Sequence, residues 1–141
     1  MNQTTYLKQE AVTPEWRITS IKGQILGKVA VKIADALMGK TKPTYTPNVD
    51  ANVYVIVTDI ESLVVTGKKQ TDKTYRFHSG WMGGIKELSL ETMMTKKPEQ
   101  VLELAVKRML PKTILGSHAL KRLKVYKGSA HPHVAQTPKP L

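Results

Sequence analysis

The chain has 141 residues, 22 of them Lys or Arg and 11 of them Asp or Glu, which gives a formal net charge of +11. This length suits one domain with a sizeable core, and the positive charge favours nucleic acid, or after it an anionic membrane surface, as the partner. Cysteine is absent, which excludes disulfides and cysteine-ligated zinc, and no apolar stretch is long enough to cross a membrane.

The first half of the chain has the pattern of a strand, a helix and a second strand. Residues 15–21 alternate apolar and polar side chains, and residues 26–38 repeat apolar side chains at the spacing of one helix face, with Gly39 as the stop. Residues 53–57, VYVIV, form a continuous apolar run, as expected of a strand covered on both faces. This order predicts parallel strands with helices packed on them.

In the second half, apolar side chains again recur at the spacing of strands or of helices, and three glycines at 80, 83 and 84 interrupt the pattern. The spacings predict a strand over 74–81, a short helix over 89–95, a longer helix over 97–110, a short helix over 118–123 and a strand over 124–126. Residues 128–141 hold three prolines and few core-forming side chains. We therefore expect them to be extended along the surface.

These elements predict the α/β class. We expect a single compact domain over residues 1–141, with a mostly parallel sheet, helices packed on both faces, basic loops and an extended C-terminal tail at 128–141. Residues 1–14 are the part expected to be flexible. The first residues lack the basic and apolar regions of a signal peptide, so we expect a cytoplasmic protein, with an organellar location as the alternative.

The positive charge is concentrated in the second half. Residues 1–64 carry seven Lys and Arg with six acids, whereas residues 65–141 carry fifteen with five acids. The last acid is Glu103, and the 38 residues after it hold eight Lys and Arg. Like charges in a folded segment repel one another, so an external polyanion best explains this bias.

Residues 66–86 combine cations, aromatic rings and glycines. Cations contact phosphates, aromatic faces stack on unpaired bases, and glycine lets a backbone approach RNA closely. Tyr75 and Phe77 are better explained as core residues of their strand, which leaves the cations and His78 as the candidate contacts. The interleaved residues are Lys68, Lys69, Lys73, Arg76 and Lys86 with Tyr75, Phe77, His78 and Trp81.

The His-Pro-His run at 131–133 suggests a metal site. Zinc or iron usually needs a carboxylate or a third fixed imidazole, and no acid follows Glu103. The cationic surroundings also oppose a dication. We predict no metal and no cofactor, and expect these histidines to donate to phosphate or stack on a base.

Gly23 and Gly27 before Lys28 resemble a phosphate-binding turn only in part, because they lack the spacing of a P-loop. A tight turn that folds a helix back on its strand explains them better, although a helix N-terminus at this place can still contact an RNA phosphate. No nucleophile elbow or carboxylate pair indicates catalysis, so we predict that the protein is not an enzyme.

Six successive stretches resemble one known family. In chain order they are YTPNVD, VTGKKQTDKTYRFHSG, GGIKELSLE, MLPKTILG, LKRLKVYKG and HPHVAQTP. Together they are similar to the bacterial and organellar form of large ribosomal subunit protein thirteen, over about residues 16–138. The chain departs from the usual pattern of that family at Arg108, at Ser117 and His118, and at Trp81 and Met82.

The resemblance implies a compact, non-catalytic α/β domain that binds large-subunit ribosomal RNA, acts early in subunit assembly and contacts neighbouring ribosomal proteins. It implies RNA contacts at Lys40, Lys42, Lys68, Lys69, Lys73, Lys112, Lys121, Lys124 and Lys127, and at His131 and His133. To these we add Arg76, His78 and Arg122 as further candidates.

Two other functions stay open at this point. A module that binds specific messenger RNAs outside the ribosome would show selective affinity for one short RNA and would not sediment with ribosomes. A nucleotide- or metal-dependent enzyme would need acids that the basic half lacks. A membrane-surface role is disfavoured because the amphipathic helix at 26–38 carries only two Lys and has the pattern of a core-packed helix.

Overall fold

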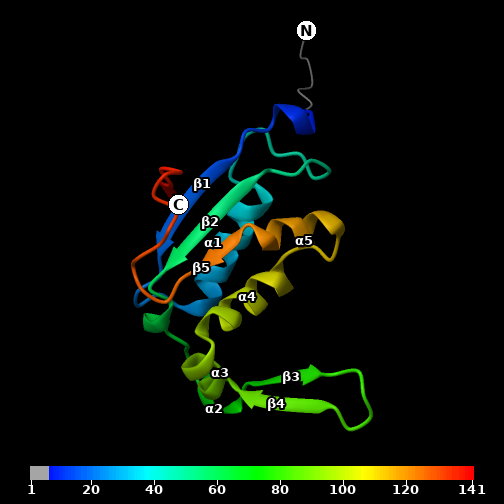
Figure 1. The fold of residues 1–141 in the computed structure, drawn as a ribbon, viewed down its shortest axis with the longest axis vertical. Helices are drawn as coiled ribbons and strands as arrows, with labels where there is room; N and C mark the ends of the chain where they lie inside the picture. The colour runs from blue at the N-terminus through cyan, green and yellow to red at the C-terminus, as the bar shows by residue number, and fades with distance from the viewer. Residues whose placement is uncertain (1–6) are drawn as a thin grey trace.

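The computed structural model describes residues 7–141. Four parallel strands form the central sheet in the order β5–β2–β1–β6, and an antiparallel pair, β3–β4, lies at one end (Figure 1). The strands are β1 (Glu15–Ser20), β2 (Val53–Thr58), β3 (Thr74–His78), β4 (Ile85–Ser89), β5 (Leu123–Val125) and β6 (Lys139–Pro140). The helices are α1 (Leu26–Met38), α2 (Lys69–Asp72), α3 (Leu90–Lys96), α4 (Pro98–Met109) and α5 (Ile114–Lys121), with 3₁₀ helices η1 (Gln9–Ala11) and η2 (Ile60–Ser62).

Strand β2 lies inside the sheet and is buried on both of its faces. Val55, Ile56 and Val57 have no exposed surface. β2 pairs with β1 on one side and with β5 on the other, and both pairings are parallel. The predicted α/β domain with a mostly parallel sheet is therefore confirmed. A continuous apolar run is stable as a strand where other elements cover both faces.

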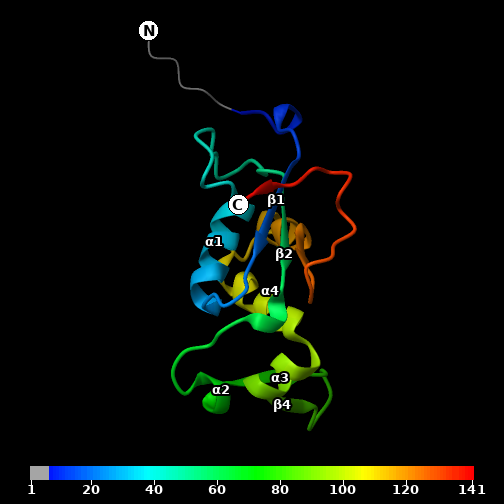
Figure 2. The same cartoon turned by 90° about the vertical axis from the view of Figure 1, so that its left-hand side faces the viewer.

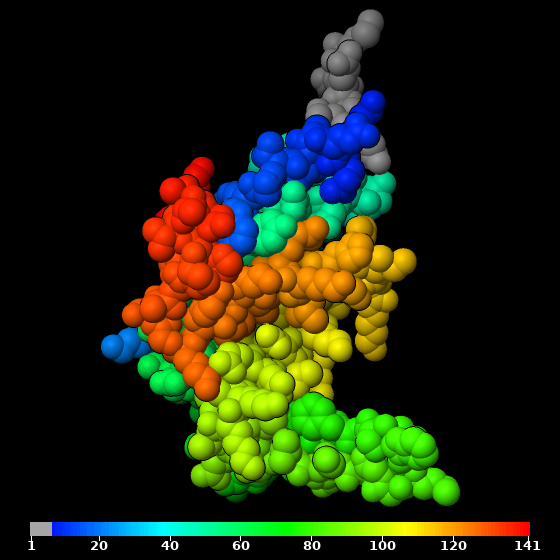
Figure 3. All heavy atoms as spheres, viewed as in Figure 1, coloured from blue at the N-terminus to red at the C-terminus, as the bar shows by residue number. Residues whose placement is uncertain are grey.

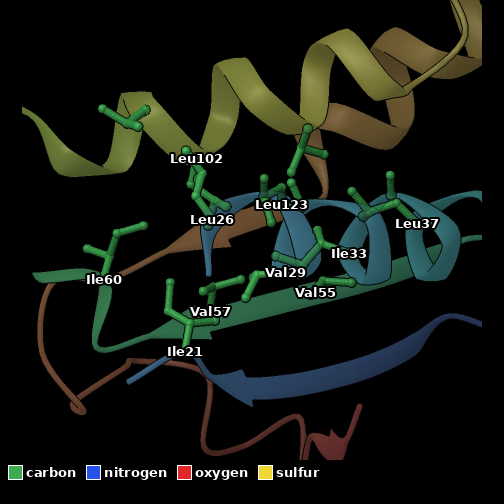
Figure 4. Packing of buried hydrophobic residues seen from close by; sticks show 14 of the residues in the cluster. Ile21, Leu26, Val29, Ile33, Leu37, Val55, Val57, Ile60, Leu102 and Leu123 are labelled. Atoms are coloured by element: carbon green, nitrogen blue, oxygen red, sulfur yellow. The ribbon is translucent and has the colours of Figure 1, made fainter. Parts of the chain in front are cut away.

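Helices α1 and α4 pack on one face of the sheet and enclose the main core. In Figure 4, Val29 and Ile33 of α1 lie against Val55 of β2, and Leu102 of α4 points into the same cluster. The apolar stripe at 26–38 predicts this arrangement, because side chains three and four positions apart share one face of a helix. Burial of the stripe against the sheet fixes which face of α1 points into the core.

The other face of the sheet is covered by the C-terminal tail. Figure 2 shows the chain after β5 crossing the face opposite α1. Here Trp16 of β1 stacks on Tyr54 of β2 with ring centroids 4.3 Å apart, and the His133 ring of the tail lies 5.0 Å from that of Trp16. The prediction of helices on both faces is thus wrong for this face. Two flat aromatic rings present a surface that an extended segment covers, and the tail then adds β6 alongside β1.

Strands β3 and β4 form a hairpin that extends away from the central sheet (Figures 1 and 3). Tyr75 lies opposite Leu88 and His78 opposite Ile85 in an antiparallel register. The sequence pattern predicts the first of these strands and misses the second. The glycine-rich segment 79–84 between them is the signal of a hairpin turn, and it points to a partner strand directly after it.

Helices α3 and α4 lie where the spacing predicts them, but α5 begins four residues before its expected start at 118. The reason is a cap at Thr113, whose Oγ1 accepts the N–H of Gly116 at 3.2 Å. A threonine hydroxyl in this position satisfies one of the unpaired N–H groups of the first turn.

The expected flexibility of residues 1–14 stays a prediction, and residues 1–6 lie outside the described residues. In the described part of this segment, the side chain of Gln9 makes two hydrogen bonds with the backbone of Asp50. Its Nε2 donates to the Asp50 carbonyl at 3.4 Å, and its Oε1 accepts the Asp50 N–H at 2.9 Å. Within residues 7–141, no helix combines the length and apolar character that a membrane crossing requires.

Gly39 closes α1 in the left-handed conformation, with a φ of +73°. Its N–H donates to the carbonyls of Ala36 and Asp35, as is typical of a glycine that ends a helix. A side chain at this position would overlap the methyl group of Ala51, which precedes β2. The close approach of these two backbones therefore requires glycine both for its φ and for its size.

We expect Gly39→Ala to lower the free energy of unfolding by about 2–4 kcal/mol, from about 1–2 for the left-handed backbone and the rest from the overlap with Ala51. Urea unfolding followed by circular dichroism measures this change. Gly67→Ala is the control, because Gly67 has a φ of +67° but open space around its position. It is expected to lose only the backbone part, and equal losses in the two variants would exclude the Ala51 contact as a cause.

Candidate nucleic-acid interface

Four lysines lie in the segment that runs from just before α5, through α5 and β5, to just after β5. In Figure 3 the residues from about 112 to 128, amber to orange, cross one face of the molecule as a continuous strip. Lys112, Lys121 and Lys127 are exposed and Lys124 is half-buried. In the described part of the chain, none of them forms an ion pair with a carboxylate. We refer to Lys112, Lys121, Lys124 and Lys127 as the basic band.

Arg122, inside this strip, has an internal partner. Its guanidinium donates two hydrogen bonds to the Asp50 carboxylate, at 2.7 and 2.5 Å, and the two side chains are only 17% and 10% exposed. The same guanidinium lies 5.8 Å from the centre of the Tyr54 ring. Arg122 thus ties the end of α5 to the segment that leads into β2. This contact uses the planar, two-pronged geometry of arginine.

Lys40 and Lys42 in the loop after α1 also have partners within the protein. Lys42 Nζ lies 3.0 Å from a carboxylate oxygen of Glu15 and donates to the Ala51 carbonyl at 3.3 Å. Lys40 Nζ lies 3.6 Å from Asp35 in a pair of which both side chains are exposed. Lys42 therefore helps to hold the loop on β1, whereas the exposed pair of Lys40 contributes little to stability.

The Glu15 carboxylate forms ion pairs with both Lys42 and Arg17. The guanidinium of Arg17 lies 2.6 Å from one of its oxygens. Burial by itself raises the pKa of Glu15, but the hydrogen bonds and positive charges of Lys42 and Arg17 outweigh it, and the pKa is lowered from its usual value near 4.5. The carboxylate is therefore held in its charged form by two cations.

The histidines of the tail pack against aromatic rings. His133 Nε2 shares a hydrogen bond of 2.8 Å with the Tyr126 hydroxyl, and the ring lies against Trp16. His131 is half-buried, with a buried Nδ1 that has no hydrogen-bond partner among the described residues. No three His, Asp or Glu side chains come together within residues 7–141 to form a group that suits a metal. His133 is thus placed to fasten the tail to the sheet.

The hairpin presents exposed apolar side chains beside polar ones. Trp81 at its tip is 79% exposed and Met82 is fully exposed. Arg76 pairs with Glu87 across the strands at 2.6 Å, and His78 Nδ1 accepts the Gly80 N–H at 2.9 Å. The hairpin therefore offers a wide surface to a partner, while two of its candidate contacts also shape its own turn and strands.

Comparison with known proteins adds the deciding observation. The family model of Ribosomal protein L13 matches residues 14–132. The chain belongs to the ribosomal protein L13 family.

Relatives support the same assignment over nearly the whole chain. The large ribosomal subunit protein uL13 of Thermosipho africanus is 51% identical over 138 residues, which cover 98% of this chain and 93% of that protein. The uL13 of Citrifermentans bemidjiense is 49% identical over 139 residues, covering 99% and 98%. The uL13 of Pseudomonas putida is 50% identical with the same coverage.

Membership of the L13 family confirms the resemblance found in the sequence stretches. A protein of this family is a component of the ribosome and not an enzyme. The basic band therefore belongs to a protein whose place is in a ribonucleoprotein.

The cations of this L13-family chain divide into two groups. Within residues 7–141, five ion pairs occupy five of the Lys and Arg side chains, and among the candidate contacts these are Lys40, Lys42, Arg76 and Arg122. The others among the described residues have no carboxylate partner. Lys68, Lys69, Lys73 and the basic band belong to this second group. The sequence reasoning does not separate the groups, because pairing depends on residues far apart in the chain.

Sequence reasoning also misses Arg108. It lies in the last turn of α4, and its guanidinium is 6.0 Å from the centre of the Tyr75 ring, on which Lys73 Nζ also lies at 5.1 Å. No local pattern marks this residue, since α4 and β3 are brought together only by the fold. Basic residues in the last turn of a helix are favoured by the helix dipole, so Lys107 and Arg108 carry no functional signal by themselves.

We expect Arg122→Met to lower the free energy of unfolding by about 2–4 kcal/mol, because it leaves the poorly exposed Asp50 carboxylate without its partner. Urea denaturation measures the loss. The adjacent Lys121→Met removes the same charge from an exposed position and is expected to change stability by less than about 0.5 kcal/mol. A loss in Lys121→Met as large as in Arg122→Met would contradict the internal role of Arg122.

The lowered pKa of Glu15 predicts a pH dependence of stability. A carboxyl whose pKa is lower in the folded than in the unfolded chain adds stability above its unfolded pKa, and this stability is lost as the pH falls through the folded pKa. We expect Glu15→Gln to be less stable than the wild type at pH 7 and the difference to vanish at a pH below that folded value. Thermal unfolding over a pH series checks this, and a difference that grows on acidification would refute it.

Proposed function

We propose that this L13-family protein is a structural constituent of the large ribosomal subunit, binds large-subunit ribosomal RNA through the basic band, and supports early assembly of the subunit. The observation that carries the proposal is the lack of internal partners for the band. Its four lysines lie in a 38-residue segment without an acid, and no described carboxylate pairs with them. An RNA backbone supplies the missing negative charge.

The relatives support the proposal through their names, which place them in the large ribosomal subunit. Neighbouring ribosomal proteins are the other proposed partners, and the exposed hairpin tip with Trp81 and Met82 offers a surface for such contacts. The ribosome concerned is proposed to be cytoplasmic, with an organellar ribosome as the alternative. No cofactor, metal or membrane takes part in this function.

The division of the cations refines the candidate RNA contacts. Lysine side chains without an acid partner keep their full charge for phosphate, whereas a guanidinium in a bidentate pair must first give up that pair. We therefore propose Lys68, Lys69, Lys73 and the basic band as the principal contacts. Secondary roles are proposed for Lys40, Lys42, Arg76, His78, Arg122, His131 and His133, all of which except His131 already have contacts within the protein.

The test is the salt dependence of binding to large-subunit ribosomal RNA. Each lysine that neutralises one phosphate contributes about 0.7–0.9 to the slope of log K against log salt. We expect the triple variant Lys112→Gln, Lys121→Gln, Lys127→Gln to lower the slope by about two to three and to weaken binding at every RNA sequence tested. Filter binding at several salt concentrations gives both quantities.

The control is the triple variant Lys8→Gln, Lys22→Gln, Lys32→Gln. It removes the same charge from three exposed lysines of the first half that lack a described acid partner. Equal slope changes in the two variants would refute the band as the binding surface. Sucrose gradients of cell lysate complete the test. Wild type that stays in light fractions at low salt would refute the ribosomal role and leave a free messenger-RNA-binding module.

A further inference from the structure

A cavity of about 370 Å³ lies between the start of α1, α2, β3 and the end of α4. Three cations, Lys69, Lys73 and Arg108, line it together with Tyr75, and no Asp or Glu is among its lining residues. Lys73 and Arg108 are 35 positions apart in the chain, so it is the fold that brings these cations together. A volume of this kind is within the range of roughly 300–1,000 Å³ typical of ligand pockets.

Two of the cations are positioned by the same ring. Lys73 Nζ lies 5.1 Å and Arg108 Cζ 6.0 Å from the centre of the Tyr75 ring, within the range of cation–π attraction. Neither has a carboxylate partner among residues 7–141. An anion in the cavity therefore meets positive charges that no carboxylate of the described residues compensates.

The Tyr75 side chain is buried and its hydroxyl is unpaired among the described residues. Only 3% of the residue is exposed. The hydroxyl oxygen has almost no accessible surface, so the part of Tyr75 that lines the cavity is its ring, which holds Lys73 and Arg108 nearby.

The N-terminus of α1 adds backbone donors to the same cavity. Leu26 N donates to the Val64 carbonyl and Val29 N to the Ile25 carbonyl, but the N–H groups of Gly27 and Lys28 have no acceptor in the described part of the chain. Gly27 lines the cavity, and the space where its side chain would be is open. Figure 2 shows α2 below the first turn of α1 on the same side of the molecule. Free N–H groups at a helix start favour an anion.

We propose that this cavity binds one phosphate group of the RNA backbone, held jointly by Lys69, Lys73, Arg108 and the N–H groups of Gly27 and Lys28. The assignment rests on the proposed function for its RNA, and it adds a defined pocket apart from the basic band. A tetrahedral phosphate accepts several hydrogen bonds at once, which matches donors from α1, from α2 with its C-cap Lys73, and from α4. A dication is excluded by the three positive charges.

Because three cations share one phosphate in this proposal, the salt dependence of RNA binding distinguishes the pocket from the basic band. The salt slope counts the phosphates that a protein neutralises. Three cations that share one phosphate therefore contribute as one contact, whereas three lysines on separate phosphates contribute as three. The triple variant Lys69→Gln, Lys73→Gln, Arg108→Gln removes the same charge as the band triple described above. We expect it to lower the salt slope by about one, against about two to three for the band triple. Circular dichroism and thermal unfolding show whether each variant keeps its fold.

A second readout locates the phosphate. In the ¹⁵N-labelled full-length wild type, RNA is expected to shift the amide signals of Gly27 and Lys28 downfield, while Arg108→Gln reduces these shifts and Lys32→Gln leaves them unchanged. Inorganic phosphate is titrated separately, with chloride at equal ionic strength as the reference. This measurement does not depend on the stability of the triple variant.

The outcomes separate the two proposals. The proposal of a shared phosphate would be overturned if the pocket triple left the salt slope unchanged or lowered it as much as the band triple does. This holds even if the band binds RNA. Amides of Gly27 and Lys28 that respond to inorganic phosphate but not to RNA would show a free-phosphate site instead and also overturn the assignment. Failure of the wild type to bind large-subunit ribosomal RNA would refute the proposed function itself.

Discussion

The burial of β2 on both faces is the constraint on which the rest of this structure depends. Val55, Ile56 and Val57 lose all contact with water only if one layer covers each face and a strand pairs at each edge. α1 and α4 supply one layer, and the tail with the Trp16–Tyr54 stack supplies the other. Elements from the beginning, the middle and the end of the chain are therefore needed at once.

The same arrangement decides how the charges are used. Acids near the sheet take up nearby cations, as Asp50 does with Arg122 and Glu15 with Lys42. These pairs fasten loops and the end of α5 onto the strands. The second half of the chain has too few acids for its cations, so the basic band stays unpaired on the surface. The RNA partner that we propose would neutralise this surface.

The fold also brings distant basic residues to one place. Lys69 begins α2, Lys73 directly precedes β3, and Arg108 lies in the last turn of α4. All three nevertheless line one cavity near the start of α1. The Tyr75 ring lies beside two of them and is itself buried by the elements around it. Packing of α4 against α1 thus places Arg108 in the same cavity as Gly27 at the start of α1, an arrangement that no single segment offers by itself.

The sequence by itself determined the elements with strong local patterns. The apolar stripe of α1, the stop at Gly39, the buried run of β2 and the surplus of positive charge are all visible in it, because periodicity, backbone freedom and charge are local properties. Only the tertiary structure decided that a tail covers the second face, that Arg122 pairs with Asp50 72 positions away, and that Arg108 and Lys73 both lie near the Tyr75 ring. These contacts depend on how segments distant in the chain come together, and local patterns do not encode that geometry.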